Sequence, residues 1–363
     1  MLLLATANEL IPLPVDPSTR LLVGILTALG SMACWVITSL SFTTAGKRFG
    51  STSVNVVRSV LAAIFLFVVV KQLSGSFFPF DLSLEILLLS LSGVLGLAVG
   101  DQLIFAAFNR AGPRLTLLVL NLVPVATAFL AWPTLGEPLN PFGWIGILLT
   151  IIGVAWVVSD QPKDVEKILK VDANYSPRLG ITLALMGVIS VSIGNVLAKQ
   201  GMTPSESGDR IGALIAQDVR MLAGAAAIVF MAVIAGACAR TIGTPPLPDP
   251  SKRPARSLAI ATLLLGTALG PILGIILFLY SAALIKLAVT TTIVALTPIA
   301  ILPFSHLVEH SPVTRKAVFG ALLGVAGVVL LTFSEPVSSE GVSAADSPPE
   351  VVSSEKLHSM HND

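Results

Sequence analysis

Long apolar stretches separated by short polar segments make up most of this sequence. A transmembrane helix needs about 20 apolar residues, and ten stretches approach that length. The first five predict helices over residues 21–41, 53–72, 84–107, 114–133 and 141–159, and the other five over residues 179–199, 213–237, 258–281, 288–307 and 316–334. We therefore expect an all-α integral membrane protein with ten transmembrane helices.

The second set of five stretches repeats the first. One constant shift along the sequence places four glycines, two prolines and one threonine on residues of the same kind: Gly96 on Gly270, Gly100 on Gly274, Gly146 on Gly320, Gly153 on Gly327, Pro124 on Pro298, Pro138 on Pro312 and Thr116 on Thr290. Because five is odd, the second copy starts on the opposite face of the membrane, so the two five-helix repeats are inverted relative to each other. An internal repeat in a strongly apolar chain is typical of a transporter built from two related halves.

Polar segments set the boundaries of the two copies. We expect an N-terminal segment over 1–20, a first repeat over 21–159, a linker over 160–178 and a second repeat over 179–334. The remaining residues, 335–363, are rich in Ser, Glu and Pro without periodicity, which predicts a disordered tail.

Composition narrows the classes of partner. Hydrophobic residues make up 54% of the chain and charged residues 12%, with a mean hydropathy of +0.88, whereas about a quarter of the residues in soluble domains are charged. A net charge of +1 provides no basic surface for nucleic acid. The expected partners are the lipid bilayer and a small-molecule substrate, with no cofactor, and a homodimer is an open alternative to a monomer.

Ionisable residues within membrane spans are candidates for function because a charge in hydrocarbon is costly. Asp101 lies well inside the third stretch, next to Gln102, and its repeat counterpart is Ile275. The asymmetry suits a single proton or substrate site, but Asp101 could also cap a helix break or pair with a buried arginine. Arg58 and Arg220 open the second stretch of each copy, and their matched placement favours a shared structural role over direct binding of an anion.

A second group of candidates lies near a predicted kink. Asn121 precedes Pro124, and proline removes a backbone hydrogen bond and bends a helix; Pro298 is its counterpart. The freed carbonyl could bind substrate, or the Asn121 side chain could satisfy it. Trp35, Asn195, Gln217 and Tyr280 are further candidates for lining a cavity, each with packing as the alternative role.

The segment His306-Leu-Val-Glu309-His310 matches the H-x-x-E-H pattern of some zinc peptidases. Such a site needs a third ligand and a catalytic cleft. The first copy has no histidine at the corresponding place, so we interpret the motif as a helix end and expect no metal site.

Several segments of the sequence resemble the motifs of one known protein family. Ala33-Cys-Trp35, then Arg58, then the run GDQLIFAAFNRAGPRLTLLVLNLVPVATAFLAWPTLGEPL resemble the EamA-type module of the drug/metabolite transporter superfamily, and residues 270–327 resemble a second module. The resemblance covers roughly residues 21–334. It implies ten helices in two inverted repeats around a central cavity, with transport by alternating access and without ATP. Trp35, Arg58, Pro124 and Glu137 match the pattern of the first module, whereas Glu309 lies two residues away from the register of Glu137.

The resemblance also predicts the orientation of the protein in the membrane, and this prediction disagrees with the distribution of Lys and Arg residues. With the N-terminus in the cytoplasm, six Lys and Arg residues lie on the cytoplasmic side and fourteen on the other, so the positive-inside rule favours both termini outside. The family implies cytoplasmic termini, in the inner or plasma membrane, and we follow the family. The sequence thus predicts a permease for a small metabolite, with possible proton coupling at Asp101. The alternatives are an intramembrane zinc enzyme that uses His306, Glu309 and His310, or a membrane scaffold without transport.

Overall fold

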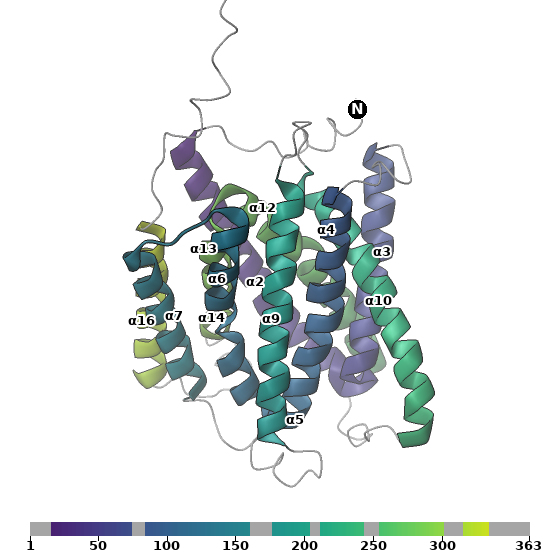
Figure 1. Cartoon of the computed structure of the whole chain (residues 1–363). Helices are drawn as coiled ribbons and strands as arrows, with labels where there is room; N and C mark the ends of the chain where they lie inside the picture. Colours follow the sequence, from purple (N-terminus) through teal and green to yellow (C-terminus); the bar gives the residue numbers. More distant parts are fainter. Residues whose placement is uncertain are drawn as a thin grey trace, which may run out of the picture.

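The computed structural model of the chain describes residues 16–74, 84–159, 176–203, 211–242, 254–300 and 315–333, and all regular structure within these ranges is helical (Figure 1). The first half contains α2 (Pro17–Phe49), α3 (Ser51–Ser74), α4 (Leu84–Ser92), the π-helix η1 (Gly93–Gly100), α5 (Asp101–Leu120), α6 (Val123–Leu135) and α7 (Pro141–Ser159). The second half contains α9 (Pro177–Met202), α10 (Ala213–Ile242), α11 (Arg256–Thr267), the π-helix η3 (Ala268–Gly274), α12 (Ile275–Leu284), α13 (Leu287–Val294), α14 (Thr297–Ala300) and α16 (Arg315–Phe333).

Every predicted span overlaps a described helix. Seven helical segments are long and apolar enough to cross a membrane, and shorter apolar helices occupy the predicted fifth, ninth and tenth spans. The ninth prediction, 288–307, extends past residue 300 into residues that the structure does not describe. The chain is therefore a multi-pass membrane protein, whereas the count of ten crossings stays a prediction.

The third and fourth spans are joined differently from the prediction. The predicted spans end at residue 107 and begin again at residue 114, whereas α5 is helical from Asp101 to Leu120 and includes the residues between them. Gly96 lies against Gly194 of α9, and Ala111 lies against Gly180. The Ser192 hydroxyl then donates to the Val123 carbonyl (3.4 Å), so the chain has returned along α9 by that point.

The inverted repeat is visible in the irregularities of the helices. η1 ends at Gly100 and η3 ends at Gly274, which is its counterpart in the second copy. The helix is interrupted between α5 and α6 and again between α13 and α14. At these breaks Leu122 donates its N–H to the Val119 carbonyl (3.0 Å), and Leu296 donates to the Ile293 carbonyl (3.1 Å). These two pairs correspond under the same shift, so the two halves share their backbone defects as well as their sequence.

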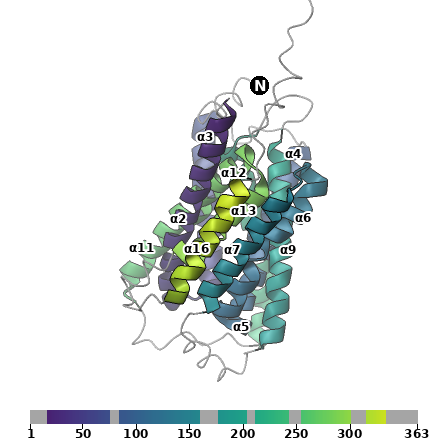
Figure 2. The same cartoon turned by 90° about the vertical axis from the view of Figure 1, so that its left-hand side faces the viewer.

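The first helix of each half packs against the other half. α9 lies along α4, η1 and α5 (Figure 1), while α2 lies along α11, η3 and α12 (Figure 2). Glycines permit the close contact: Gly270 faces the Thr38 side chain, and Gly96 faces the Gly194 backbone. The result is two mixed bundles, each made from the third and fourth spans of one half and the first span of the other half.

Two helix pairs complete the arrangement. α3 packs against α10, and α7 packs against α16 at one side of the molecule (Figure 2). Leu21, Leu139, Ile285 and Leu331 meet in one apolar cluster. The start of α2, the end of α16 and the connector after α6 therefore lie at the same end of the molecule.

A candidate polar site within the helix bundle

Asp101 and Arg58 form an ion pair between α5 and α3. Asp101 begins α5 directly after η1, and its Oδ2 accepts from Arg58 Nη2. Arg58 Nε donates to Asn55 Oδ1 (2.8 Å). The exposed fraction is 7% for the Arg58 side chain and 26% for that of Asp101, so the carboxylate is the more exposed partner of the pair.

Aromatic rings complete the surroundings of Arg58. Its guanidinium lies 5.2 Å from the centroid of Phe42 on α2 and 5.8 Å from that of Phe105 on α5. Cation–π contacts of this kind favour a cation that has been removed from water. Among the roles expected for Asp101, the structure contains the pairing with a buried arginine.

Arg220 on α10 has fewer hydrogen-bond partners than Arg58. It is 2% exposed, and its Nε and Nη1 have no hydrogen-bond partner within the described structure. Its Nη2 lies beside Gly96 of η1, and Asp101 is the charge that acts on it. Arg58 and Arg220 thus approach Asp101 from helices that are equivalent in the two repeats.

Two neighbours of Arg220 on α10 are also buried and polar. Gln217 Nε2 donates to the Pro271 carbonyl of η3 (2.7 Å), while its Oε1 has no partner in the described structure. Asp218 is 1% exposed, and its Oδ1 also has none. Asp218 did not enter our sequence predictions, although a carboxyl group within an apolar stretch was the signal that identified Asp101.

A second ion pair lies at the end of the molecule that holds the start of α2. Gly136 ends α6 in the left-handed conformation (φ 64°), and Glu137 follows. Glu137 pairs with Lys199 of α9, and Glu137 Oε2 accepts from the Leu287 N–H (2.9 Å). Lys199 Nζ donates to the Ile285 carbonyl (2.7 Å). We call Glu137, Lys199, Ile285 and Leu287 the Glu137 cluster; the sequence indicated Glu137 alone, through the family resemblance.

The remaining predicted residues are placed as follows. Asn121 is buried at the helix break, and its Nδ2 has no partner in the described structure. Trp35 packs against an apolar cluster that includes Phe278 and Leu279. Gln102, Asn195 and Tyr280 are half-buried. His306, Glu309 and His310 lie outside the described residues; among those described, no three potential metal ligands come together.

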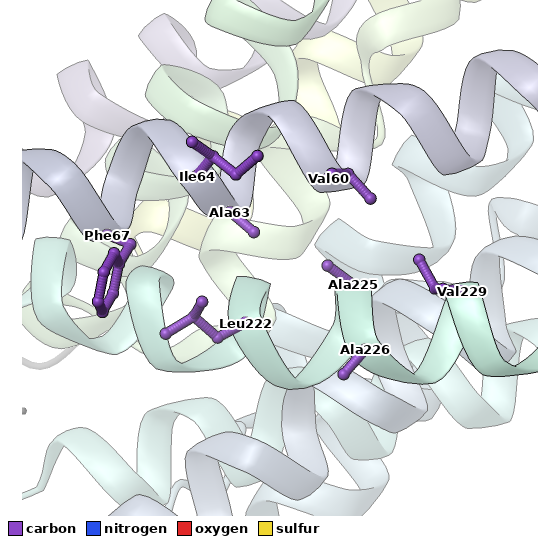
Figure 3. A pocket seen from close by; sticks show the side chains of 8 residues that line it. All are labelled: Val60, Ala63, Ile64, Phe67, Leu222, Ala225, Ala226 and Val229. Atoms are coloured by element: carbon purple, nitrogen blue, oxygen red, sulfur yellow. The ribbon is translucent and has the colours of Figure 1, made fainter.

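An apolar groove separates α3 from α10 on the outside of the molecule (Figure 3). Its volume is about 330 Å³. The register that aligns Arg58 with Arg220 also gives each groove residue of α3 a counterpart in α10: Val60 and Leu222, Ala63 and Ala225, Ile64 and Ala226, Phe67 and Val229. Equivalent residues of the two repeats therefore line the two sides of the groove, and every residue that lines it is apolar.

Comparison with known proteins agrees with the repeat. The model of the EamA-like transporter family matches residues 22–159 and 178–333. Among 28 matching chains of solved structures, one known only as the crystal structure of a protein is 16% identical with a TM-score of 0.62. The match covers 85% of this chain and 97% of that one. At this identity the match shows the fold alone. No curated protein matches the sequence.

Proposed function

The chain belongs to the EamA-like transporter family, and on that premise we propose that it is a secondary transporter of a small metabolite that works by alternating access. The single observation that carries this proposal is the pairing of helix defects in the two repeats. Both copies contain a π-helix and a proline-associated break at equivalent positions. Interrupted helices at a repeat interface are a common basis of binding sites in secondary transporters.

The breaks release backbone groups where two bundles meet. Pro124 and Pro298 have no N–H to donate to the carbonyls of Leu120 and Val294, four residues before them. In the second copy the Thr297 hydroxyl donates to the Val294 carbonyl (2.6 Å). The first copy has Val123 in place of Thr297, which supplies no such donor. The Leu120 carbonyl, with the nearby Asn121 amide, is thus one of the polar contacts that we propose for the substrate.

The Glu137 cluster supports a state closed at one end. It connects α9 and the α6–α7 connector, which belong to one bundle, to the α12–α13 connector of the other. The inverted repeat predicts an equivalent cluster at the opposite end. There, however, Thr43 replaces Lys199 and donates within its own helix to Ser39 (2.7 Å), and Pro113, which has no N–H, replaces Leu287. We infer that opening the Glu137 end requires breaking the Glu137–Lys199 ion pair, whereas the other end has Thr43 in the place of the lysine.

Asp101 is the residue that we propose for coupling to protons. Protonation of its carboxyl group would release Arg58, and the carboxylate is the more exposed partner of the pair. The test compares wild type with Asp101→Asn in proteoliposomes, with uptake measured as a function of pH. Loss of proton-coupled uptake is the expected result; an unchanged rate with an unchanged pH response would refute the coupling role.

A further inference from the structure

The two repeats provide unequal copies of one polar arrangement. The register that aligns α3 with α10 pairs Asn55 with Gln217 and Arg58 with Arg220, and the register that places Gly100 on Gly274 pairs Asp101 with Ile275. The first copy thus consists of an amide, an arginine and a carboxylate, and the second of an amide, an arginine and an isoleucine. The carboxylate is therefore missing from the second copy, and an apolar, buried side chain stands in its place.

Several buried polar atoms of the second copy have no hydrogen-bond partner in the described structure. In the first copy the amide oxygen of Asn55 accepts from Arg58 Nε. In the second copy, Arg220 Nε and Nη1 and Gln217 Oε1 are all buried without a hydrogen-bond partner in the described structure. The orientation of the Gln217 amide is fixed, because only its nitrogen can donate to the Pro271 carbonyl. Its oxygen is thus an acceptor without a donor.

The second copy contains a buried positive charge without a negative charge of its own. Asp101 is paired with Arg58, so one negative charge serves two arginines. Asp218 does not neutralise Arg220, because residues two apart on a helix point about 200° away from each other. A buried guanidinium without its own counterion is unfavourable, so an anion is the natural ligand for this place.

We propose that Arg220 and Gln217 bind the transported substrate, and that the substrate is a small organic anion whose carboxylate supplies the negative charge that Asp101 supplies in the first copy. Arg220 and Gln217 are three residues apart and therefore share one face of α10. Gln217 Oε1 accepts from a donor on the same molecule, which selects a carboxylate that also carries a hydroxyl or amino group. This inference rests on the proposed transport function and names its class of substrate.

Two substitutions separate ligand binding from a structural role of Arg220. Arg220→Gln removes the unpaired charge, so the protein without ligand should remain at least as stable as wild type while anions no longer stabilise it. Ile275→Asp adds the missing carboxylate, and Ile275 lies in the same apolar cluster as Ala216 and Val219, next to Arg220 on α10. It should likewise abolish the effect of anions. Ile228→Asp, which places a carboxylate at a fully buried position elsewhere on α10, is the matched control and should destabilise the protein.

The experiment measures thermal unfolding of the detergent-purified full chain with lactate and serine, and with the uncharged-carboxyl analogues lactamide and serinamide. At a hundredfold excess over Kd, a ligand that binds only the folded state should raise Tm by roughly 3–4 °C. We expect this rise for at least one acid with wild type, no rise with its amide, and none with Arg220→Gln or Ile275→Asp.

Three results would overturn the inference: equal stabilisation by acids and amides, no stabilisation by either acid, or anion stabilisation that persists in Arg220→Gln. A large loss of stability in ligand-free Arg220→Gln would also contradict it, because that result assigns Arg220 a structural role. Failure of the transport proposal can be distinguished from failure of this inference. A protein that is stabilised by these acids but transports none of them in proteoliposomes would contradict the carrier function and leave the binding site in place.

Discussion

Asp101 and Arg58 illustrate what a single buried charge requires from its surroundings. The carboxylate, the Asn55 amide and two aromatic rings together satisfy one guanidinium inside an apolar bundle. Removal of one partner from a buried pair leaves an uncompensated charge, which costs about 3 kcal/mol or more. The pair therefore contributes to the fold as well as to the site.

This leads to a prediction about pairs of substitutions. Asp101→Asn should lower the free energy of unfolding by about 3 kcal/mol, because Arg58 loses its counterion. Arg58→Gln combined with Asp101→Asn should recover much of that loss, since no charge remains buried. Thermal unfolding of the purified variants measures both changes. If the double variant loses as much as the two single variants added together, the two residues do not act as a pair.

Single residues were predictable in location but not in partnership. A carboxyl within an apolar stretch identified Asp101, and the same signal at Asp218 was overlooked. Arg58 is 43 residues from Asp101 in the sequence. Glu137 belongs to the first repeat, whereas its partner Lys199 lies on the first helix of the second repeat. Such pairs depend on how helices pack, and packing is not encoded in the spacing of residues along one helix.

At the scale of elements, glycines determine how closely helices approach. A Cβ added at Gly153 of α7 would overlap the Gly324 backbone nitrogen of α16, whereas one added at Gly46 of α2 would meet nothing within 4 Å. Small residues at helix interfaces in membranes allow backbones to come into contact in this way. The sequence repeat identified Gly153, and the structure explains it by packing.

Gly153→Ala should therefore separate α7 from α16 and lower stability by about 2 kcal/mol, in the range for overpacked sites. Gly46→Ala is the control and should leave stability equal or slightly higher, since alanine is the better helix former. Thermal unfolding in the same detergent compares the two variants. Equal melting temperatures for Gly153→Ala and wild type would show that the α7–α16 contact is loose in the protein.

Other features of the elements were beyond the sequence. Hydrophobic stretches predicted the position of each helix, and prolines predicted interruptions near Pro124 and Pro298. The π-helices η1 and η3 were not predicted, because a widened turn leaves the run of apolar residues unchanged. The helix of α5 also continues through residues 108–113, which lie between two predicted spans.

At the scale of the whole molecule, the Glu137 cluster makes the two ends unequal. Lys199→Met removes the ion pair with Glu137 and the hydrogen bond to the Ile285 carbonyl. We expect the Glu137 end to open more often as a result. Lys286→Met, one residue beyond Ile285, is the matched control and should leave the end closed.

The opening can be followed with a buried probe. Ala28 is fully buried in the apolar cluster below this end, and Ala28→Cys in a background without Cys34 and Cys238 should react several times faster with an aqueous maleimide when Lys199→Met is present. Ala62→Cys, buried on α3, should not change. Faster reaction at both cysteines would instead indicate general loosening of the fold.

The inverted repeat predicted that the halves are related, but it left their interlocking open. The exchange of α2 and α9 between the halves, which creates the two bundles, depends on contacts such as Gly270 with Thr38 and Gly96 with Gly194. These contacts join residues of one copy to residues of the other. A comparison of the copies with each other therefore could not reveal them, and the side of the membrane on which each end lies stays a prediction.

Counterflow in proteoliposomes is the most direct test of the central claim that this chain is a carrier. Vesicles that contain the purified protein are loaded with an unlabelled acid that stabilises it, and the labelled acid is supplied outside without ATP or an ion gradient. A carrier that alternates between two states should accumulate the label transiently above its equilibrium level. Label entry no faster than in protein-free vesicles would contradict the account.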